Sequence, residues 1–232
     1  MTDARRAELG ANLRDVHARM ATAAEAVGRD PAELTLVVVT KTWPASDVRL
    51  LAELGVHEVG ENRDQEAAAK AAALTDVPLV WHFVGQLQSN KVRSVVRYAD
   101  VVESVDRPRL VTVLEREAGE RHRVIRCLVQ VALDDVPGRG GVVPAGLAAL
   151  ADQVASSPHL RLTGLMAVAP FGADPEVAFD RLAGLARQLR TDHPAATVVS
   201  AGMSGDLEAA VRHGATHVRI GTAVLGHRPP IR

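Results

Sequence analysis

The chain has 232 residues, of which 47% are hydrophobic and 24% are charged, and its formal net charge is −1. A chain of this length and hydrophobic content can bury a sizeable core, as one large domain or two small ones. The near-zero charge argues against a nucleic-acid binder, because phosphate contacts require a clustered excess of basic residues. No run approaches the roughly 20 apolar residues of a membrane span, and residues 1–6 lead into no apolar stretch typical of a secretory signal.

The single cysteine, Cys127, fits a reducing cytosol, because one cysteine cannot form an internal disulfide. It lies within the apolar run 125–129, so we interpret it as a packed core thiol rather than a nucleophile. We therefore expect a soluble cytoplasmic protein. The sequence pattern shows no long apolar surface patch, which favours a monomer.

One pattern recurs along the chain: a short β-branched run, a small or polar corner, and then an amphipathic helical stretch. A leading helix is predicted at about residues 4–27 and is closed by Gly28. The predicted strands span residues 34–39, 57–59, 79–84, 101–103, 125–131, 160–165, 197–199 and 217–220. The predicted helices between them run from near Pro44 to Gly55 and then over residues 63–74, 89–98, 106–119, 145–156, 175–190 and 204–213.

Eight strands with little polar alternation, joined by helices, predict a parallel sheet covered by helices. Eight such units in a chain of this size indicate a single closed (β/α)8 TIM-type barrel, here with an extra N-terminal helix. A doubly wound open sheet is the alternative, but it usually has five or six strands, and no Gly-x-Gly-x-x-Gly turn follows the first predicted strand. With no linker in the sequence, residues 1–232 are expected to form one domain.

Four residues are expected to mark helix ends in this arrangement. Asp106 and Ser204 are predicted to cap the N-termini of their helices. Gly119 and Gly214 are predicted to stop helices at their C-termini.

In such a barrel the chemistry gathers at the C-terminal ends of the strands, so the residues just past each strand are the informative ones. Lys41 follows the first predicted strand directly behind a β-branched run. At the end of a buried strand, desolvation penalises the ammonium form, and a neutral amine is what Schiff-base chemistry with an aldehyde requires. The alternative is a lysine whose ammonium group reaches solvent from the strand end.

The loops after the seventh and eighth predicted strands give a second signal, because they combine hydroxyls with glycines: Ser200, Gly202, Ser204, Gly221 and Thr222. Barrels often bind phosphate with these two loops, and amides at a helix start attract anions. Turn and capping chemistry explains the same residues without any ligand. Arg219 lies on the last strand, where it is either a cation inside the barrel that needs a partner or a side chain that faces a helix.

Barrel closure would make these two signals neighbours, because it sets the last strand beside the first. A ligand that carries both an aldehyde and a phosphate would satisfy Lys41 and the glycine-rich loops together. Pyridoxal 5′-phosphate (PLP) is such a ligand. The residues therefore predict a PLP site where the first and last strands meet.

Seven stretches of the sequence carry a family resemblance: residues 39–42, 60–62, 81–85, 87–91, 164–166, 202–204 and 218–222. They span nearly the whole chain, and their combination is highly specific. In them the chain resembles the PLP homeostasis (YggS/PROSC) family of PLP-binding proteins. Members of this family are single barrels similar to the barrel of alanine racemase (PLP fold type III), without its C-terminal β-domain.

The resemblance implies roles for individual residues. Lys41 would form the Schiff base with PLP, and the phosphate would be contacted by Ser200, Gly221 and Thr222. Arg219 would face the pyridine nitrogen, and the pocket would be lined by Asn62, His82 and Met166. A permanently charged guanidinium cannot take up the ring proton, so the pyridine nitrogen would stay largely unprotonated and the ring would be a weaker electron sink. No metal ligand is assigned.

A few positions depart from the family pattern or add little to it. Arg139 stands where the pattern leads us to expect a lysine, which leaves its part in PLP transfer open, and Gln86 is given no role. His82 fits a core histidine equally well. Trp43 and Trp81 are interpreted as packing residues.

By resemblance, the chain is a PLP-binding protein that holds or delivers PLP and maintains vitamin B6 and amino-acid and keto-acid homeostasis, with PLP-dependent apo-enzymes as candidate partners. The alternative is a PLP-dependent amino-acid racemase of weak activity, which needs acid/base groups on both faces of the substrate. Lys41 could serve one face, but the only tyrosine, Tyr98, is predicted far from the strand ends. A third possibility, a phosphate-binding barrel enzyme without PLP, leaves Lys41 unexplained. Whether the N-terminal helix packs on the barrel or serves a partner is left open.

Overall fold

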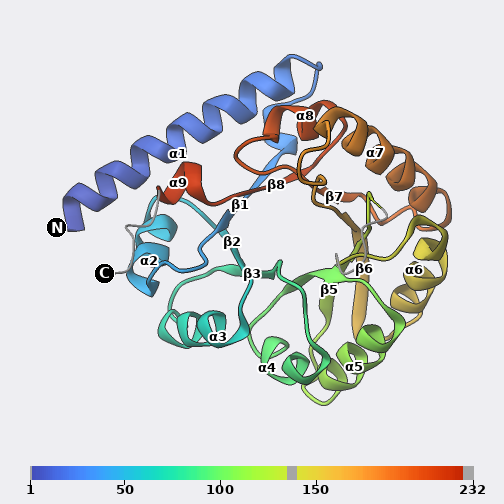
Figure 1. The fold of residues 1–232 in the computed structure, drawn as a ribbon. Helices are drawn as coiled ribbons and strands as arrows, with labels where there is room; N and C mark the ends of the chain where they lie inside the picture. Colours follow the sequence, from blue (N-terminus) through green and yellow to red (C-terminus); the bar gives the residue numbers. More distant parts are fainter. Residues whose placement is uncertain (1, 135–139, 227–232) are drawn as a thin grey trace.

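A closed barrel of eight parallel strands forms the centre of the computed structural model, which describes residues 2–134 and 140–226. Arg139 lies outside the described residues. The strands follow one another around the barrel in chain order, and the helices form an outer ring (Figure 1). The strands are β1 (Thr35–Val39), β2 (Glu58–Glu61), β3 (Val80–Phe83), β4 (Val101–Val105), β5 (Ile125–Gln130), β6 (Leu160–Met166), β7 (Val198–Ser200) and β8 (His217–Ile220).

Pairing between β1 and β8 closes the barrel, with Val38 opposite Ile220. The prediction of a closed barrel rather than an open sheet is therefore confirmed. Just beyond β8, Gly221 packs closely against the end of β1, since a Cβ there would stand 3.2 Å from the main-chain O of Val39. The chain segments that leave β1 and β8 consequently begin side by side.

The α-helices that surround the strands are α1 (Thr2–Glu25), α2 (Ala45–Glu53), α3 (Asp64–Ala73), α4 (Val92–Val95), α5 (Pro108–Gly119), α6 (Leu147–Ala155), α7 (Pro175–Asp192), α8 (Leu207–Arg212) and α9 (Thr222–Leu225). Short 3-10 turns, η1 (Pro31–Glu33), η2 (Ser89–Lys91) and η3 (Pro144–Gly146), precede β1, α4 and α6. None of the helices in the described part of the chain is long and apolar enough to cross a membrane.

Several predicted boundaries were wrong. The helix expected over residues 89–98 is reduced to η2 and α4, in a stretch whose β-branched residues, Val92, Val95 and Val96, have modest helix propensity. The stretch after β8, for which no helix was predicted, contains α9.

The two predicted N-caps were also wrong, whereas the two helix stops are confirmed. Arg107 is the N-cap of α5 and is followed by Pro108 at the first helical position, which suits proline. Helix α8 starts only at Leu207, because Asp206 Oδ1 accepts from the Met203 amide at 2.6 Å and holds the preceding residues in a turn. Helix α5 ends at Gly119, and Gly214 follows α8 with φ +86°.

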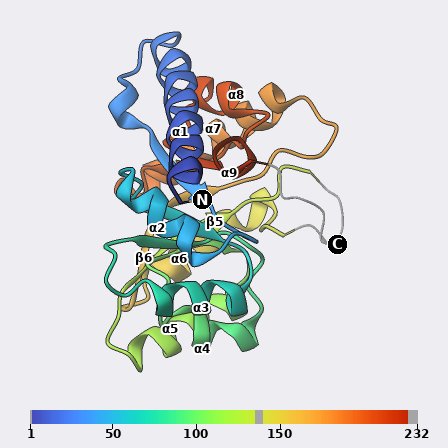
Figure 2. The same cartoon turned by 90° about the vertical axis from the view of Figure 1, so that its left-hand side faces the viewer.

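The N-terminal helix packs on the barrel, which answers the question left open by the sequence. Its apolar face, including Leu13 and Val16, joins a core cluster with residues of β1, β2, β8, α8 and α9. Asn12 donates to the Val224 carbonyl at 2.9 Å, and Arg19 donates to the Ser204 carbonyl at 3.0 Å. Helix α1 lies across α8 and α9 (Figures 1 and 2), so it braces the segments that follow β7 and β8.

The apolar core lies mainly between the strands and the helices. On β3, Trp81 and Phe83 belong to the apolar clusters of this outer layer. Trp43 is half-buried and packs against one of those clusters, so the packing interpretation of both tryptophans is confirmed. Cys127 is also buried in this core, where burial raises the pKa of its thiol to about 12, as expected for an inert core cysteine.

The inside of the barrel is more polar than is usual. Barrels of this type generally fill their interior with branched apolar side chains. Here five polar side chains that contact one another come from five strands: Glu58, His82, Glu103, Ser200 and Arg219. We call these residues the axial column.

Candidate functional site

Lys41 lies in a turn immediately after β1, at the C-terminal mouth of the barrel. The Trp43 amide donates to the Thr40 carbonyl at 3.1 Å and closes this turn. The Lys41 side chain is exposed, so of the two interpretations that the sequence left open, the lysine that reaches solvent is confirmed and the desolvated one was wrong. The reason is that β1 ends at Val39 and the chain has left the barrel wall by the time it reaches the lysine.

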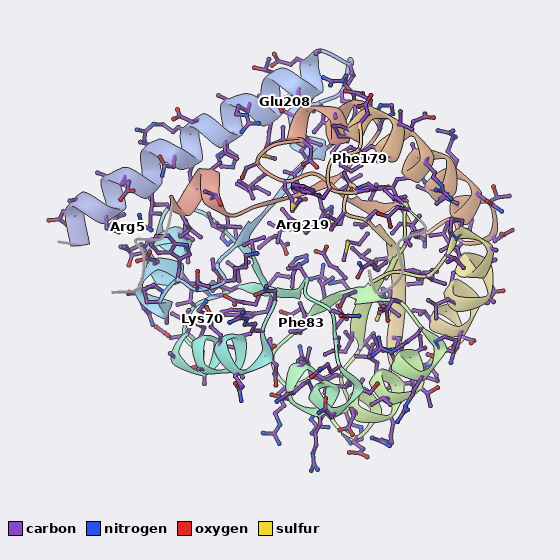
Figure 3. The ribbon with its side chains drawn as sticks, in the orientation of Figure 1. Arg5, Lys70, Phe83, Phe179, Glu208 and Arg219 are labelled. Carbon is purple, nitrogen blue, oxygen red and sulfur yellow. The ribbon has the colours of Figure 1, made fainter. Side chains whose placement is uncertain are left out.

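The main chain on both sides of Lys41 is held from outside the barrel wall. Lys70 Nζ, on α3, donates to the Thr40 carbonyl at 2.7 Å. The same ammonium pairs with Glu61 Oε1 and Glu66 Oε1, each at 2.6 Å. Glu66 in turn accepts a hydrogen bond from the Thr42 amide. We call Glu61, Glu66 and Lys70 the outer clamp; Figure 3 shows Lys70 on the barrel side of α3.

The outer clamp is an ionic cluster with two of its three members buried. Lys70 is 6% exposed and Glu61 is fully buried. Burial raises the pKa of Glu61 above its ordinary value, although the hydrogen bonds from Lys70 and Thr40 act in the opposite direction. Thr42, held by the clamp, has φ +69°, a left-handed conformation that is costly for a β-branched residue. The clamp therefore fixes a strained turn.

Arg219 points into the barrel, the one of its two predicted orientations in which it needs partners (Figure 3). Its Nη1 donates to Ser200 Oγ at 2.6 Å, and its Nη2 donates to the Ala167 carbonyl at 2.8 Å. Glu103 Oε2 lies 3.6 Å from Nη1. Burial lowers the pKa of Arg219 from its usual very high value, but a guanidinium stays charged in proteins.

Ser200 has a different place from the one expected for a phosphate ligand. It is fully buried at the end of β7, and its hydroxyl donates to Glu103 Oε2 at 2.6 Å while accepting from Arg219. Both its proton and a lone pair are thus engaged inside the barrel. A direct contact between this hydroxyl and a phosphate outside would require these bonds to break.

His82 is likewise engaged inside the barrel. Its Nδ1 lies 2.7 Å from Glu103 Oε1, and its Nε2 lies 2.5 Å from Glu58 Oε2. Burial alone would lower the pKa of His82, but these two carboxylates raise it to about 9. At neutral pH the ring is therefore an imidazolium that donates to both acids. With both nitrogens occupied, His82 acts as an interior histidine rather than as a direct cofactor ligand.

The other predicted pocket residues lie around the same mouth. Met166 is 1% exposed at the end of β6 and pairs in register with Ser200. Asn62 follows β2 and lines a cavity of about 270 Å³ between the ends of β2 and β3, together with Gln86 and Lys91. Its backbone passes so close to Gly85 that a Cβ on that glycine would stand 2.3 Å from the Asn62 carbonyl oxygen. Asn62 is thus fixed at the rim, while Met166 is part of the buried floor.

Gly221 and Thr222 form the corner where β8 ends and α9 begins. Thr222 is exposed and Gly221 is half-buried, so this corner is open to solvent next to the Lys41 turn. Gly202 differs, because its φ is +90° and a Cβ would stand 2.7 Å from the Cβ of Ala210. Local packing therefore explains Gly202 without a ligand.

The sequence interpretation missed four residues that organise the site: Glu58, Glu66, Lys70 and Glu103. A signal was present in three of them. Glu103 interrupts an apolar run inside a strand, and Glu66 and Lys70 have the i, i+4 spacing of a helix ion pair. The remaining partners, however, come from distant segments: Thr40 and Glu61 for Lys70, and His82 and Ser200 for Glu103.

Tyr98, which a racemase would need at the mouth, lies elsewhere. It follows α4 and precedes β4, so it stands near the N-terminal ends of the strands. Its ring packs edge-on against Trp81, with the ring centroids 6.4 Å apart. No group equivalent to a second acid/base tyrosine can come from this side chain.

Comparison with known proteins gives a consistent family likeness. The model of a family described as the N-terminal domain of alanine racemase matches residues 11–229. A pyridoxal phosphate homeostasis protein from Mycobacterium tuberculosis is 44% identical, covering 97% of this chain and 94% of the relative. One of the same description from Escherichia coli is 38% identical, covering 95% and 97%.

Solved structures agree with this likeness. PipY from Synechococcus elongatus, determined with PLP bound, is 35% identical, with a TM-score of 0.83 over 94% of this chain and 100% of that chain. An alanine racemase from Clostridium difficile shares the fold, with a TM-score of 0.73 at 13% identity. The match covers 96% of this chain but 57% of the racemase.

Proposed function

The chain belongs to the family of pyridoxal phosphate homeostasis proteins, and from this premise we propose that it binds PLP at the C-terminal mouth of its barrel and holds or delivers the cofactor. The observation that carries the proposal is a juxtaposition. The turn with Lys41 follows β1, and the corner with Gly221 and Thr222 follows β8. Because β1 and β8 are paired, these two segments lie side by side. Arg219 lies buried at the end of one of those strands.

The residues fit the chemistry of PLP. Lys41 is an exposed amine that would form a C=N bond with the aldehyde as the aldehyde oxygen leaves as water. Gly221 carries no side chain that would obstruct an anion, and Thr222 offers a hydroxyl at the first turn of α9. Arg219 is a fixed positive charge for the ring nitrogen. Ser200 and His82 act in this proposal through Arg219 rather than through direct contact.

A holding or delivering role is preferred to catalysis, because residues 2–134 and 140–226 supply few acid/base groups at the mouth. Racemisation needs proton transfer on both faces of the bound substrate, and Tyr98 lies toward the other end of the barrel. Weak racemase activity is the second candidate, favoured only by the exposed amine of Lys41. Cofactor transfer to apo-enzymes, effects on amino-acid and keto-acid balance, a monomeric state and a cytoplasmic location complete the proposal.

Reductive trapping of the bound aldehyde tests the proposal sharply, because the chain has only three lysines: Lys41, Lys70 and Lys91. The full chain is loaded with PLP and reduced with borohydride, and the pyridoxyl group is mapped by peptide mass spectrometry. We expect a yellow protein and modification at Lys41. Lys41→Ala should lose at least ten-fold of the label, whereas Lys91→Ala, which removes the other lysine near the mouth, should keep it.

Two outcomes would contradict this assignment. A protein that takes up no PLP would refute the binding function itself. Label on Lys91, or on the chain N-terminus, with Lys41 unmodified would refute the lysine but not the binding. Alanine and serine racemase assays on the loaded protein separate the two candidate functions, and turnover near about 10 per second, the enzyme median, would favour the racemase.

A further inference from the structure

Glu103 is the central member of the axial column and lies behind Arg219, the residue that would face the ring nitrogen. It is fully buried on β4. One of its carboxylate oxygens lies 2.7 Å from His82 Nδ1 and the other accepts from the Ser200 hydroxyl at 2.6 Å. Both oxygens are therefore engaged, one toward each end of the column.

The charges of the column alternate along its length. Glu58 is an acid, His82 an imidazolium, Glu103 an acid and Arg219 a guanidinium, and each neighbours a group of opposite sign. Burial alone would raise the pKa of Glu103, but the hydrogen bond from His82 and the nearby charges lower it to about 2. The carboxylate is thus ionised throughout the neutral range. Buried charges persist only where such partners compensate them.

Two further titratable groups, His217 on β8 and Arg126 on β5, lie close enough to Glu58 and His82 to act on this part of the column. Burial lowers the pKa of His217, and the positive charge of His82 lowers it further. His217 is therefore neutral near pH 7 and does not compete with His82 for the two carboxylates. The cation that neighbours Glu103 on the side away from His82 is Arg219.

We propose that Glu103 is a positioning residue for the cofactor: with His82 behind it and Ser200 as the bridge, it holds in a fixed place the Arg219 guanidinium that would face the pyridine nitrogen. This inference rests on the proposed function, because it assigns Arg219 to the ring nitrogen. Glu103 touches no ligand itself. It acts by fixing the Ser200 hydroxyl as an acceptor for Arg219 Nη1, since that hydroxyl donates its single proton to the Glu103 carboxylate.

Neutralising the carboxylate would loosen this arrangement. In Glu103→Gln the amide no longer balances the guanidinium, and it presents a donor to one of its two partners. Arg219 then has a neutral hydroxyl and the Ala167 carbonyl as its remaining partners. Its side chain is then free to adopt other rotamers. Ordering it when PLP binds costs free energy, so the affinity for PLP falls.

The test compares Glu103→Gln with Ser200→Ala and with Glu115→Gln as a matched control. Glu115 Oε1 also lies 2.7 Å from a histidine nitrogen, His159 Nδ1, but this pair is partly exposed and lies outside the barrel. PLP affinity is measured by titration of the visible absorbance or by fluorescence quenching, on protein shown by circular dichroism to be folded. We expect the Kd to rise about ten-fold for Glu103→Gln, about three-fold for Ser200→Ala and less than two-fold for Glu115→Gln.

A second readout separates positioning from general destabilisation. The pH midpoint of the visible absorbance of bound PLP should fall in Glu103→Gln, because removing a buried anion disfavours protonation nearby. It should stay unchanged in Glu115→Gln. A Kd and a midpoint in folded Glu103→Gln equal to those of the unaltered chain would overturn the inference while leaving PLP binding intact. If Glu103→Gln does not fold, the Ser200→Ala value decides, and an unchanged Kd there overturns the inference. If the unaltered chain fails to bind PLP, the proposed function and this inference both fall.

Discussion

Two buried ionic clusters flank the mouth of the barrel, and they work on different parts of the chain. The outer clamp holds main-chain groups, because Lys70 and Glu66 bind the Thr40 carbonyl and the Thr42 amide. The axial column holds a side chain, because Ser200 and Glu103 surround the guanidinium of Arg219. One cluster therefore fixes where the chain goes, and the other fixes where a charge lies.

This difference bears on how the amine of Lys41 would be used. The clamp reaches the residues before and after Lys41, whereas the lysine side chain itself is exposed. The protein thus constrains the backbone under the amine and leaves the amine accessible to an incoming aldehyde. The side chain of Arg219, in contrast, is buried, and its hydrogen bonds to Ser200 and to the Ala167 carbonyl fix its direction. An exposed amine and a fixed cation suit a site that must load and release its ligand.

The largest expected effect is on the clamp, through Lys70→Met. Glu61 would remain fully buried with Thr40 Oγ1 as its remaining donor in the clamp. Removing one partner of a buried ion pair costs about 3 to 5 kcal/mol. We expect a loss of this size in the free energy of unfolding, measured by urea denaturation at pH 7.

Lys91→Met is the matched control, because Lys91 is only half-buried and lines the rim cavity. It should change the free energy of unfolding by less than about 0.5 kcal/mol. Equal losses in the two variants would show that the clamp contributes no special stability and would remove the contrast between the two clusters.

The next effect is a pH dependence carried by the column. The folded pKa of His82 is about 9 against its ordinary value of 6.5, so its contribution is fully present below pH 6.5 and is lost as the pH rises through 9. Glu103 has a folded pKa of about 2 against 4.5, so its contribution is present above pH 4.5 and is lost as the pH falls toward 2. The column should therefore stabilise the fold most between about pH 4.5 and 6.5.

His82→Gln isolates the alkaline limb of this dependence. Near pH 6 the variant should be less stable than the unaltered chain by about 3 kcal/mol, and the difference should shrink steadily between pH 6.5 and 9.5. The measurement is the free energy of unfolding in urea at a series of pH values. A difference that does not vary with pH would show that His82 is not charged in the folded chain.

The sequence predicted the barrel well because its signals are local and repeated. Each strand–helix unit can be recognised within about 30 residues of sequence. Eight such units in one domain leave few folds other than a closed barrel. The neighbourhood of Lys41 and Gly221 followed from closure alone. The pairing of β1 with β8 confirms it.

The two clusters could not be predicted in the same way, because their contacts join distant positions. Glu103 meets Ser200 across 97 positions of the chain, and which side of a strand faces inward depends on register. For this reason the sequence could not decide whether the Arg219 side chain points into the barrel or toward a helix outside it. The inward turn of the Ser200 hydroxyl and the exposure of Lys41 were both decided by where a strand ends, to within one or two residues. Strand ends are the least certain feature of a sequence-based prediction.

The smallest effect tests whether the clamp imposes the strained turn at Lys41. Thr42→Gly removes the cost of φ +69° for a β-branched residue and should stabilise the fold by about 1 kcal/mol. If the clamp causes the strain, Thr42 can relax once the clamp is broken. The gain should then fall below about 0.3 kcal/mol in the Lys70→Met background, a coupling measured by a double-mutant cycle in urea. His122→Gly is the control, since His122 has φ +51° in the turn that follows α5 and its gain should be the same in both backgrounds. An equal gain from Thr42→Gly with and without Lys70 would mean that the turn holds its own conformation, and the clamp would then be a stabilising cluster with no hold on the amine.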